Sequence, residues 1–240
     1  MPITNIIIIV GTVLFASFVN RLSGFAFGMI MLCVLPYMMD YLQAVAFCKI
    51  LGIIIGAYSL IRYRNAINWK IVGHFLPTML IANAAGIWCA KYNPGIDMVK
   101  LLGVFFIIYG SYSLLYKKEL HLKNTWYNIL IFSALGGFVD GFLGPGGPFT
   151  VIYLLSIGLI KYEYFATVQL IFGIEGLFDL ILRIANGMIG LFAVKMAIVC
   201  IPVFFLGFAL GGLIYNKLNA KVLKDIIYGV IIVCGVINLV

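Results

Sequence analysis

The chain has 240 residues, of which 64% are hydrophobic and only 10% are charged. A soluble domain has about half apolar and about a quarter charged residues, so this composition excludes a soluble globular protein. Apolar stretches long enough to enter a bilayer recur along the whole chain, so we predict a single all-α membrane domain over residues 1–240. The net charge of +8 comes from basic residues in short loops, which indicates membrane orientation and not a nucleic-acid partner.

The first half of the chain is predicted to contain one interrupted helix and three full spans. A helix over residues 3–19 is followed by a break at 20–24 and a short helix that ends near Pro36. The three spans that follow are predicted over residues 44–61, 69–90 and 101–116.

The second half has the same order of elements after a polar stretch at 117–124. A helix over residues 126–139 precedes a break at 144–148 and a short helix to about residue 157. Three spans are again predicted, over residues 164–184, 188–215 and 222–240.

The two halves match each other at an offset of about 120 residues, which divides the domain into repeats 1–120 and 121–240. Polar residues and glycines carry the match; a chance similarity of two apolar stretches is the alternative. The matched pairs include Asn20 and Asp140, Gly24 and Gly144, Lys49 and Gln169, and Gly56 and Gly176.

If each broken segment returns the chain to its own side, each half crosses the membrane an odd number of times. The repeats are then inverted, and each carries a broken or re-entrant helix pair followed by three transmembrane helices, the plan of many secondary transporters. Most of the 16 basic residues fall on one side, which predicts the cytoplasmic face of a cell membrane, either inner or plasma. Both termini are predicted to be non-cytoplasmic.

The second break is the most informative segment of the sequence. Two prolines and four glycines between Asp140 and Pro148 cannot continue a helix, and unpaired backbone groups are costly in lipid. The short helix that follows would direct free N–H groups toward the break, as in known anion sites. We therefore predict substrate binding by Gly144, Pro145, Gly146 and Gly147; a simple kink or packing point is the alternative.

The first break contains fewer glycines but carries an arginine. A guanidinium binds an oxyanion through two parallel hydrogen bonds, so Arg21 is a candidate ligand for an anion. Arg21 snorkelling to the interface or pairing with Asp140 are the alternatives. The candidate substrate-binding residues at this break are Asn20, Arg21, Ser23 and Gly24.

Six ionisable residues fall within predicted membrane segments, at a cost of about 3 kcal/mol each if they faced lipid. They must therefore pair with one another or line a cavity. Asp179 and Arg183 are four residues apart on one helix face, which predicts an ion pair. Asp140 and Glu175 are candidates for proton coupling, because burial disfavours the charged form of a carboxyl group. The six residues are Arg21, Lys49, Asp140, Glu175, Asp179 and Arg183.

Lys49 and Gln169 lie on helix faces that also carry glycines, and such small residues allow helices to pack closely. We expect both side chains to point inward and to contact an anion; snorkelling of Lys49 is the alternative. The sequence contains no spaced metal ligands, no phosphate-binding loop and no nucleophile elbow, so we predict no catalytic residue, metal or cofactor.

Taken together, these motifs resemble the sulfite exporter TauE/SafE family of membrane transport proteins over essentially the whole chain. The resemblance is clearest at 144–148, Gly-Pro-Gly-Gly-Pro, with 166–169, Ala-Thr-Val-Gln, and weaker at 24–28. It implies a secondary transporter, expected to export sulfite or organosulfonates. Phe25 and Phe27 stand at positions where small residues are expected, and their rings would narrow the pocket or contact an organic tail.

The sequence thus predicts a carrier that binds a small sulfur-containing anion near the midplane, between two broken helices, and alternates its access. Its partners are the anion and membrane lipid, and a homo-oligomer is left open. An intramembrane enzyme using Asp140 and Glu175, a membrane scaffold, and a transporter of a non-sulfur organic anion are the alternative functions.

Overall fold

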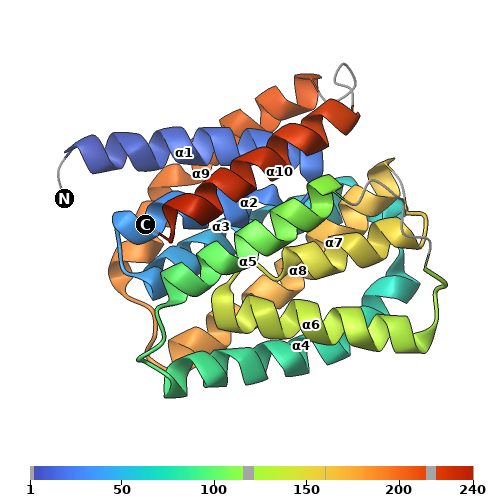
Figure 1. Ribbon diagram of the computed structural model, residues 1–240. Coiled ribbons are helices and arrows are strands. Elements are labelled where there is room, and N and C mark those ends of the chain that lie inside the picture. The colour runs from blue at the N-terminus through green and yellow to red at the C-terminus, as the bar shows by residue number, and fades with distance from the viewer. Residues whose placement is uncertain (1–2, 116–121, 160, 215–219, 240) are drawn as a thin grey trace. The chain divides into compact units, whose positions relative to one another are not determined.

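The computed structural model describes residues 3–115, 122–159, 161–214 and 220–239, and within these ranges every regular element is a helix (Figure 1). An interrupted helix followed by three further helices occurs in each half, as predicted. The inverted relation between the halves stays a prediction. The boundary that we placed at residues 120 and 121 lies outside the described residues.

The first interrupted helix consists of α1 (Ile3–Ser23) and α2 (Ala26–Val34), followed by the short turn η1 (Leu35–Tyr37). Our predicted break at 20–24 was too wide, because α1 continues through Arg21 to Ser23. The chain leaves the helix only at Gly24, whose φ of +85° is a conformation that side chains disfavour. The remaining helices of this half are α3 (Tyr41–Arg62), η2 (Arg64–Ala66), α4 (Trp69–Tyr92) and α5 (Met98–Leu115).

The second interrupted helix consists of α6 (Trp126–Leu143) and α7 (Gly147–Ser156), with Gly144 at a φ of +97° between them. The span predicted to start at 188 starts instead at Leu191, because Gly187 turns the chain at a φ of +68°. The other helices of this half are α8 (Lys161–Ala185), α9 (Leu191–Ile214) and α10 (Ala220–Ile237).

Seven of the described helices are long and apolar enough to cross a membrane, while α2 and α7 are too short to do so alone. The protein is therefore a multi-pass integral membrane protein. The seven helices are α1, α3, α4, α5, α6, α8 and α9.

The helices divide into two compact units that do not follow the two halves of the sequence. Unit 1 contains Met1–Cys48, Ile96–Lys117 and Ile189–Val240, and unit 2 contains Lys49–Gly95 and Lys118–Met188. Each unit therefore takes helices from both halves, and α3 contributes to both. The assignment of one membrane domain with two repeats stays a prediction.

In unit 2, α4 and α6 run side by side along the lower edge of the view in Figure 1. Gly137 and Gly141 of α6 lie directly against the backbone carbonyls of Met79 and Asn83 on α4. Gly86 of α4 lies in the same way against α6. A side chain at any of these positions would separate the two helices, so glycine sets their distance.

The same kind of contact joins α3 to α8 in unit 2. The Cα atom of Gly173 lies 2.5 Å from the position that a Cβ atom on Gly56 would take. This close approach confirms that the glycine-bearing face of each helix packs inward.

Unit 1 uses glycines in a similar way. Gly207 of α9 lies against the Leu14 carbonyl of α1. In the pair formed by α5 and α10, the carbonyl oxygens of Gly103 and Gly235 are each 2.8 Å from the Cβ position of the other glycine. Both units therefore depend on close backbone contacts that larger residues would prevent.

We predict that Gly137→Ala destabilises the protein by about 1–3 kcal/mol, because the added methyl group meets the Met79 carbonyl. The measurement is thermal unfolding of the purified protein in detergent. Gly73→Ala on α4 is the control, since nothing lies within 4 Å of a Cβ atom there. Equal stability of the two variants would show that α4 and α6 do not depend on this contact.

Candidate functional site

The second break is built around the side chain and the carbonyl of Asp140. The N–H group of Gly144 donates to the Asp140 carbonyl at 2.7 Å and closes the last turn of α6. The N–H group of Gly146, just before α7, donates to Asp140 Oδ1 at 2.8 Å. Asp140 therefore binds both sides of the break, through its carbonyl and through its carboxylate. The carboxylate lies at the positive end of α7.

The first break repeats this geometry in unit 1. The N–H group of Gly24 donates to the Asn20 carbonyl at 2.7 Å, and Asn20 Oδ1 accepts from the N–H group of Phe27 at 3.4 Å. Asn20 thus takes the role in its break that Asp140 takes in the second. Both breaks begin with the same backbone contact, with a neutral amide side chain in one break and a carboxylate in the other.

The other candidate residues of the first break are engaged within unit 1. Ser23 Oγ accepts from the N–H groups of Phe25 and Ala26 at 3.3 and 3.2 Å, so side chains of the chain itself cap the start of α2. The guanidinium of Arg21 lies 4.9 Å from the ring centre of Phe208 on α9, a cation–π distance.

Phe27 is buried in unit 1 and packs edge-on against Phe204, with ring centres 5.0 Å apart. This contact gives the Phe27 ring a packing role on α9. Phe25 precedes α2 as its N-cap residue and is half-buried.

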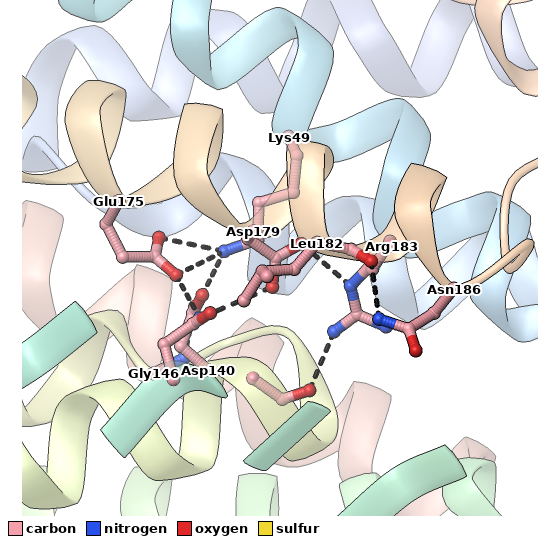
Figure 2. A network of polar contacts seen from close by, with 10 residues as sticks. Lys49, Asp140, Gly146, Glu175, Asp179, Leu182, Arg183 and Asn186 are labelled. Atoms are coloured by element: carbon pink, nitrogen blue, oxygen red, sulfur yellow. Dashed lines mark hydrogen bonds and ion pairs between the residues drawn. The ribbon is translucent and has the colours of Figure 1, made fainter. Parts of the chain in front are cut away.

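A network of buried charges surrounds Asp140 in unit 2 (Figure 2). The ammonium group of Lys49 forms ion pairs with Asp140 and with Glu175, the latter at 2.9 Å. Lys49 is 8% exposed and Glu175 is 1% exposed. Lys49 therefore points inward, as predicted, and does not snorkel; the structure places it between two carboxylates.

A second ion pair joins Asp179 and Arg183, one turn apart on α8. Arg183 Nε donates to Asp179 Oδ1 at 2.7 Å, and a terminal nitrogen of the same guanidinium donates to the Gly141 carbonyl at 2.7 Å. The predicted Asp179–Arg183 pair is confirmed. The Arg183 guanidinium also binds the Gly141 carbonyl near the end of α6. The spacing of residues along α8 did not predict this second contact.

Asn83 is a member of this network that the sequence analysis missed. Its Nδ2 donates to a carboxylate oxygen of Glu175 and, at 3.3 Å, to Asp179 Oδ2. Asn83 lies on α4, where it is fully buried. The signal in the sequence that could have identified Asn83 is an amide in the middle of an apolar span.

The three carboxylates lie close enough together to hold a metal ion, with one oxygen of each within 4.8 Å of the others. Lys49 and Arg183 already pair with these groups, so the positive charge beside them comes from the chain itself. The predicted absence of a metal stays a prediction. The three residues are Asp140, Glu175 and Asp179.

Unit 2 thus brings together Lys49, Asp140, Glu175 and the backbone of Gly146. Gln169 lies in the same unit, buried on α8, six residues before Glu175. The remaining candidates of the second break are Gly144, Pro145 and Gly147, which lie between α6 and the first residue of α7.

We predict that Asp179→Asn or Arg183→Gln alone costs about 3–5 kcal/mol of stability, because each leaves a buried charge without its partner. The double variant is expected to cost clearly less than the sum of the two. Unfolding of the purified variants in detergent measures these values. Lys100→Gln, in an exposed pair with Asp97 at 3.7 Å, is the control and should change stability by about 0–1 kcal/mol. Additive costs for Asp179 and Arg183 would contradict the pairing.

The family model described as Sulfite exporter TauE/SafE matches residues 9–237 of the chain. The search of curated proteins and the search of solved structures give no match. The match covers nearly the whole chain, including both interrupted helices and the buried charge network. The chain therefore belongs to the sulfite exporter TauE/SafE family, and it is a membrane transport protein and not an enzyme.

Proposed function

We propose that the protein is a secondary carrier that exports small sulfur-containing anions such as sulfite or organosulfonates by alternating access. Family membership supports the transport of an anion. Repeated broken helices support a carrier mechanism, because secondary transporters typically bind substrate at discontinuous helices within the membrane.

The observation that carries this proposal is the way in which unit 2 holds the Asp140 carboxylate. The N–H group of Gly146 and the ammonium group of Lys49 both bind it, at the N-terminus of a helix. Backbone N–H groups and ammonium groups also bind the oxygens of sulfite and sulfonates. The second break therefore has the donors that an oxyanion needs, and an anion entering it would compete with Asp140.

In this proposal the second break binds substrate through the segment 144–147 and Lys49, with Gln169 contributing an amide from α8. At the first break, Ser23 and Asn20 already accept hydrogen bonds from the amides that start α2. We propose that Arg21 contacts the anion through its guanidinium, with Asn20, Ser23 and Gly24 shaping its surroundings.

Proton coupling follows from the sharing of Lys49. One ammonium group balances only one of the two carboxylates that it contacts, Asp140 and Glu175. A bound anion would add a further negative charge to this buried region. We propose that a proton on Asp140 or Glu175 compensates for this charge during transport.

The second candidate is a carrier for a non-sulfur organic anion, because a carboxylate is the oxyanion that the break already holds. The same donors serve both classes, so the substrate screen has to contain both. The prediction of an intramembrane enzyme is set aside by the family to which the chain belongs.

We expect sulfite or an organosulfonate to raise the unfolding temperature of the purified protein. Stabilisation by about 2.7 kcal/mol is expected at a ligand concentration of 100 times Kd. The screen compares sulfite, sulfoacetate, taurine, sulfate and carboxylate analogues. Stabilisation by carboxylates alone would favour the second candidate, and a lack of response to every anion would contradict a carrier of either class.

Variants locate the binding site. Arg21→Ala and Lys49→Ala should lose the stabilisation, while Arg62→Ala, at the exposed end of α3, should keep it. If Arg21→Ala and Lys49→Ala reach normal levels and still bind and transport sulfite like the parent protein, the proposed site is wrong.

We also propose that the carrier lies in the cell membrane with both termini on the non-cytoplasmic side. A reporter that is active only outside the cytoplasm, fused to the C-terminus, should be active. A cytoplasmic reporter at the same position should be silent. The opposite result would contradict the proposed orientation of the carrier in the membrane.

A further inference from the structure

The buried network of unit 2 contains more negative than positive charge. Its carboxylates are Asp140, Glu175 and Asp179, which are 6%, 1% and 0% exposed. Its cations are Lys49 and Arg183, which are also buried. Three negative charges face two positive ones, so the network has a net charge of −1 when every group is ionised. A buried charge without a partner is strongly disfavoured inside a membrane protein.

The contacts show which carboxylate lacks compensation. Asp179 pairs with the Arg183 guanidinium, at 2.7 Å. Asp140 has both the Lys49 ammonium and the N–H group of Gly146. Glu175 shares Lys49 with Asp140, and it also accepts from the neutral amide of Asn83.

The closeness of the three carboxylates supports a bound proton independently of the charge count. One oxygen of each lies within 4.8 Å of the others, and like charges at such distances disfavour ionisation of all three. Asn83 is 0% exposed, and its Oδ1 has no hydrogen-bond partner among the described residues. The nitrogen of the same amide contacts Glu175 and Asp179. The amide therefore faces the two carboxylates with its donor group, and because it is neutral it balances neither charge.

We infer that Glu175 is the proton-binding residue of this network, and that Asn83 is the positioning residue whose amide donates to its carboxyl group. The charged groups that face Glu175 are Lys49 from α3, Asp140 from α6, and Asp179 and Arg183 from α8. The residue that α4 contributes is the uncharged Asn83, and the N–H group of Gly146, just before α7, binds the Asp140 carboxylate.

This inference rests on the proposed function and assigns the coupled proton to one of the two candidate carboxylates. With Glu175 protonated, Lys49 balances Asp140 alone, and the network as a whole is neutral. Asp140 stays ionised at the start of α7, where an incoming anion would compete with it. The two carboxylates then have different roles. Glu175 carries the proton, and Asp140 binds the Gly146 amide at the break.

Infrared spectroscopy of the purified protein tests this assignment without any transport assay. The chain has only eight Asp and Glu residues, so a band from one protonated carboxyl group can be assigned. At neutral pH we expect the carbonyl stretch of a protonated carboxylic acid, shifted in D2O and by carboxyl-13C labelling of glutamate. The band should be absent from Glu175→Gln and present in Glu163→Gln, which changes an exposed glutamate outside the network.

The glutamate label keeps the test valid even if Glu175→Gln does not fold. A protonated band that shifts with labelled aspartate, or the absence of any such band, would overturn the assignment to Glu175. Loss of the band on adding sodium at constant pH would show that a metal ion supplies the missing charge instead.

Asn83→Leu tests the positioning role, because a merely structural residue would change stability without changing the carboxyl band. We expect the band of Glu175 to move in frequency when its amide partner is removed. An unchanged band would overturn the role of Asn83. If the band behaves as expected but no anion binds, the proton site stands and the proposed transport function fails.

Discussion

The sharing of one lysine by two carboxylates is the interaction on which the rest of unit 2 depends. Lys49 holds Asp140 and Glu175 together, and Asp140 in turn holds the amide of Gly146 at the start of α7. The two pieces of the broken helix are thereby connected to α3 and α8 by charge and not only by packing. Any ligand that competes for Lys49 or for the Gly146 amide therefore acts on the break itself.

Close helix packing makes this network feasible in a membrane. Gly141 of α6 lies directly against the backbone of Asn83 on α4, and the Asn83 side chain contacts Glu175 and Asp179 on α8. The Gly141 carbonyl accepts from Arg183. Each polar group is thus held by neighbours from a different helix. Such mutual pairing is the condition under which buried charges are tolerated in a bilayer.

Local patterns in the sequence predicted much of this arrangement. Hydropathy predicted the spans, and the run of glycines and prolines predicted the second break. The four-residue spacing of Asp179 and Arg183 predicted their ion pair. The first break was predicted too wide because Asn20 and Arg21 are polar, yet both fit within a helix until Gly24 ends it.

Local sequence patterns could not predict the contacts of Lys49. Its partners lie 91 and 126 residues away along the chain, and only the packing of α3 against α6 and α8 brings them together. Asn83 was missed for a related reason, because a neutral amide has a clear role only once the carboxylates beside it are known.

The central claim is that the Glu175 proton is coupled to the movement of the anion. The most direct measurement follows the pH inside proteoliposomes while a sulfonate gradient drives flux, since the charge of a sulfonate does not change near neutral pH. Proton coupling at Glu175 predicts that the internal pH changes during sulfonate flux through the parent protein. This pH change should be absent in Glu175→Gln. Sulfonate flux through the parent protein with no change in internal pH would contradict proton coupling.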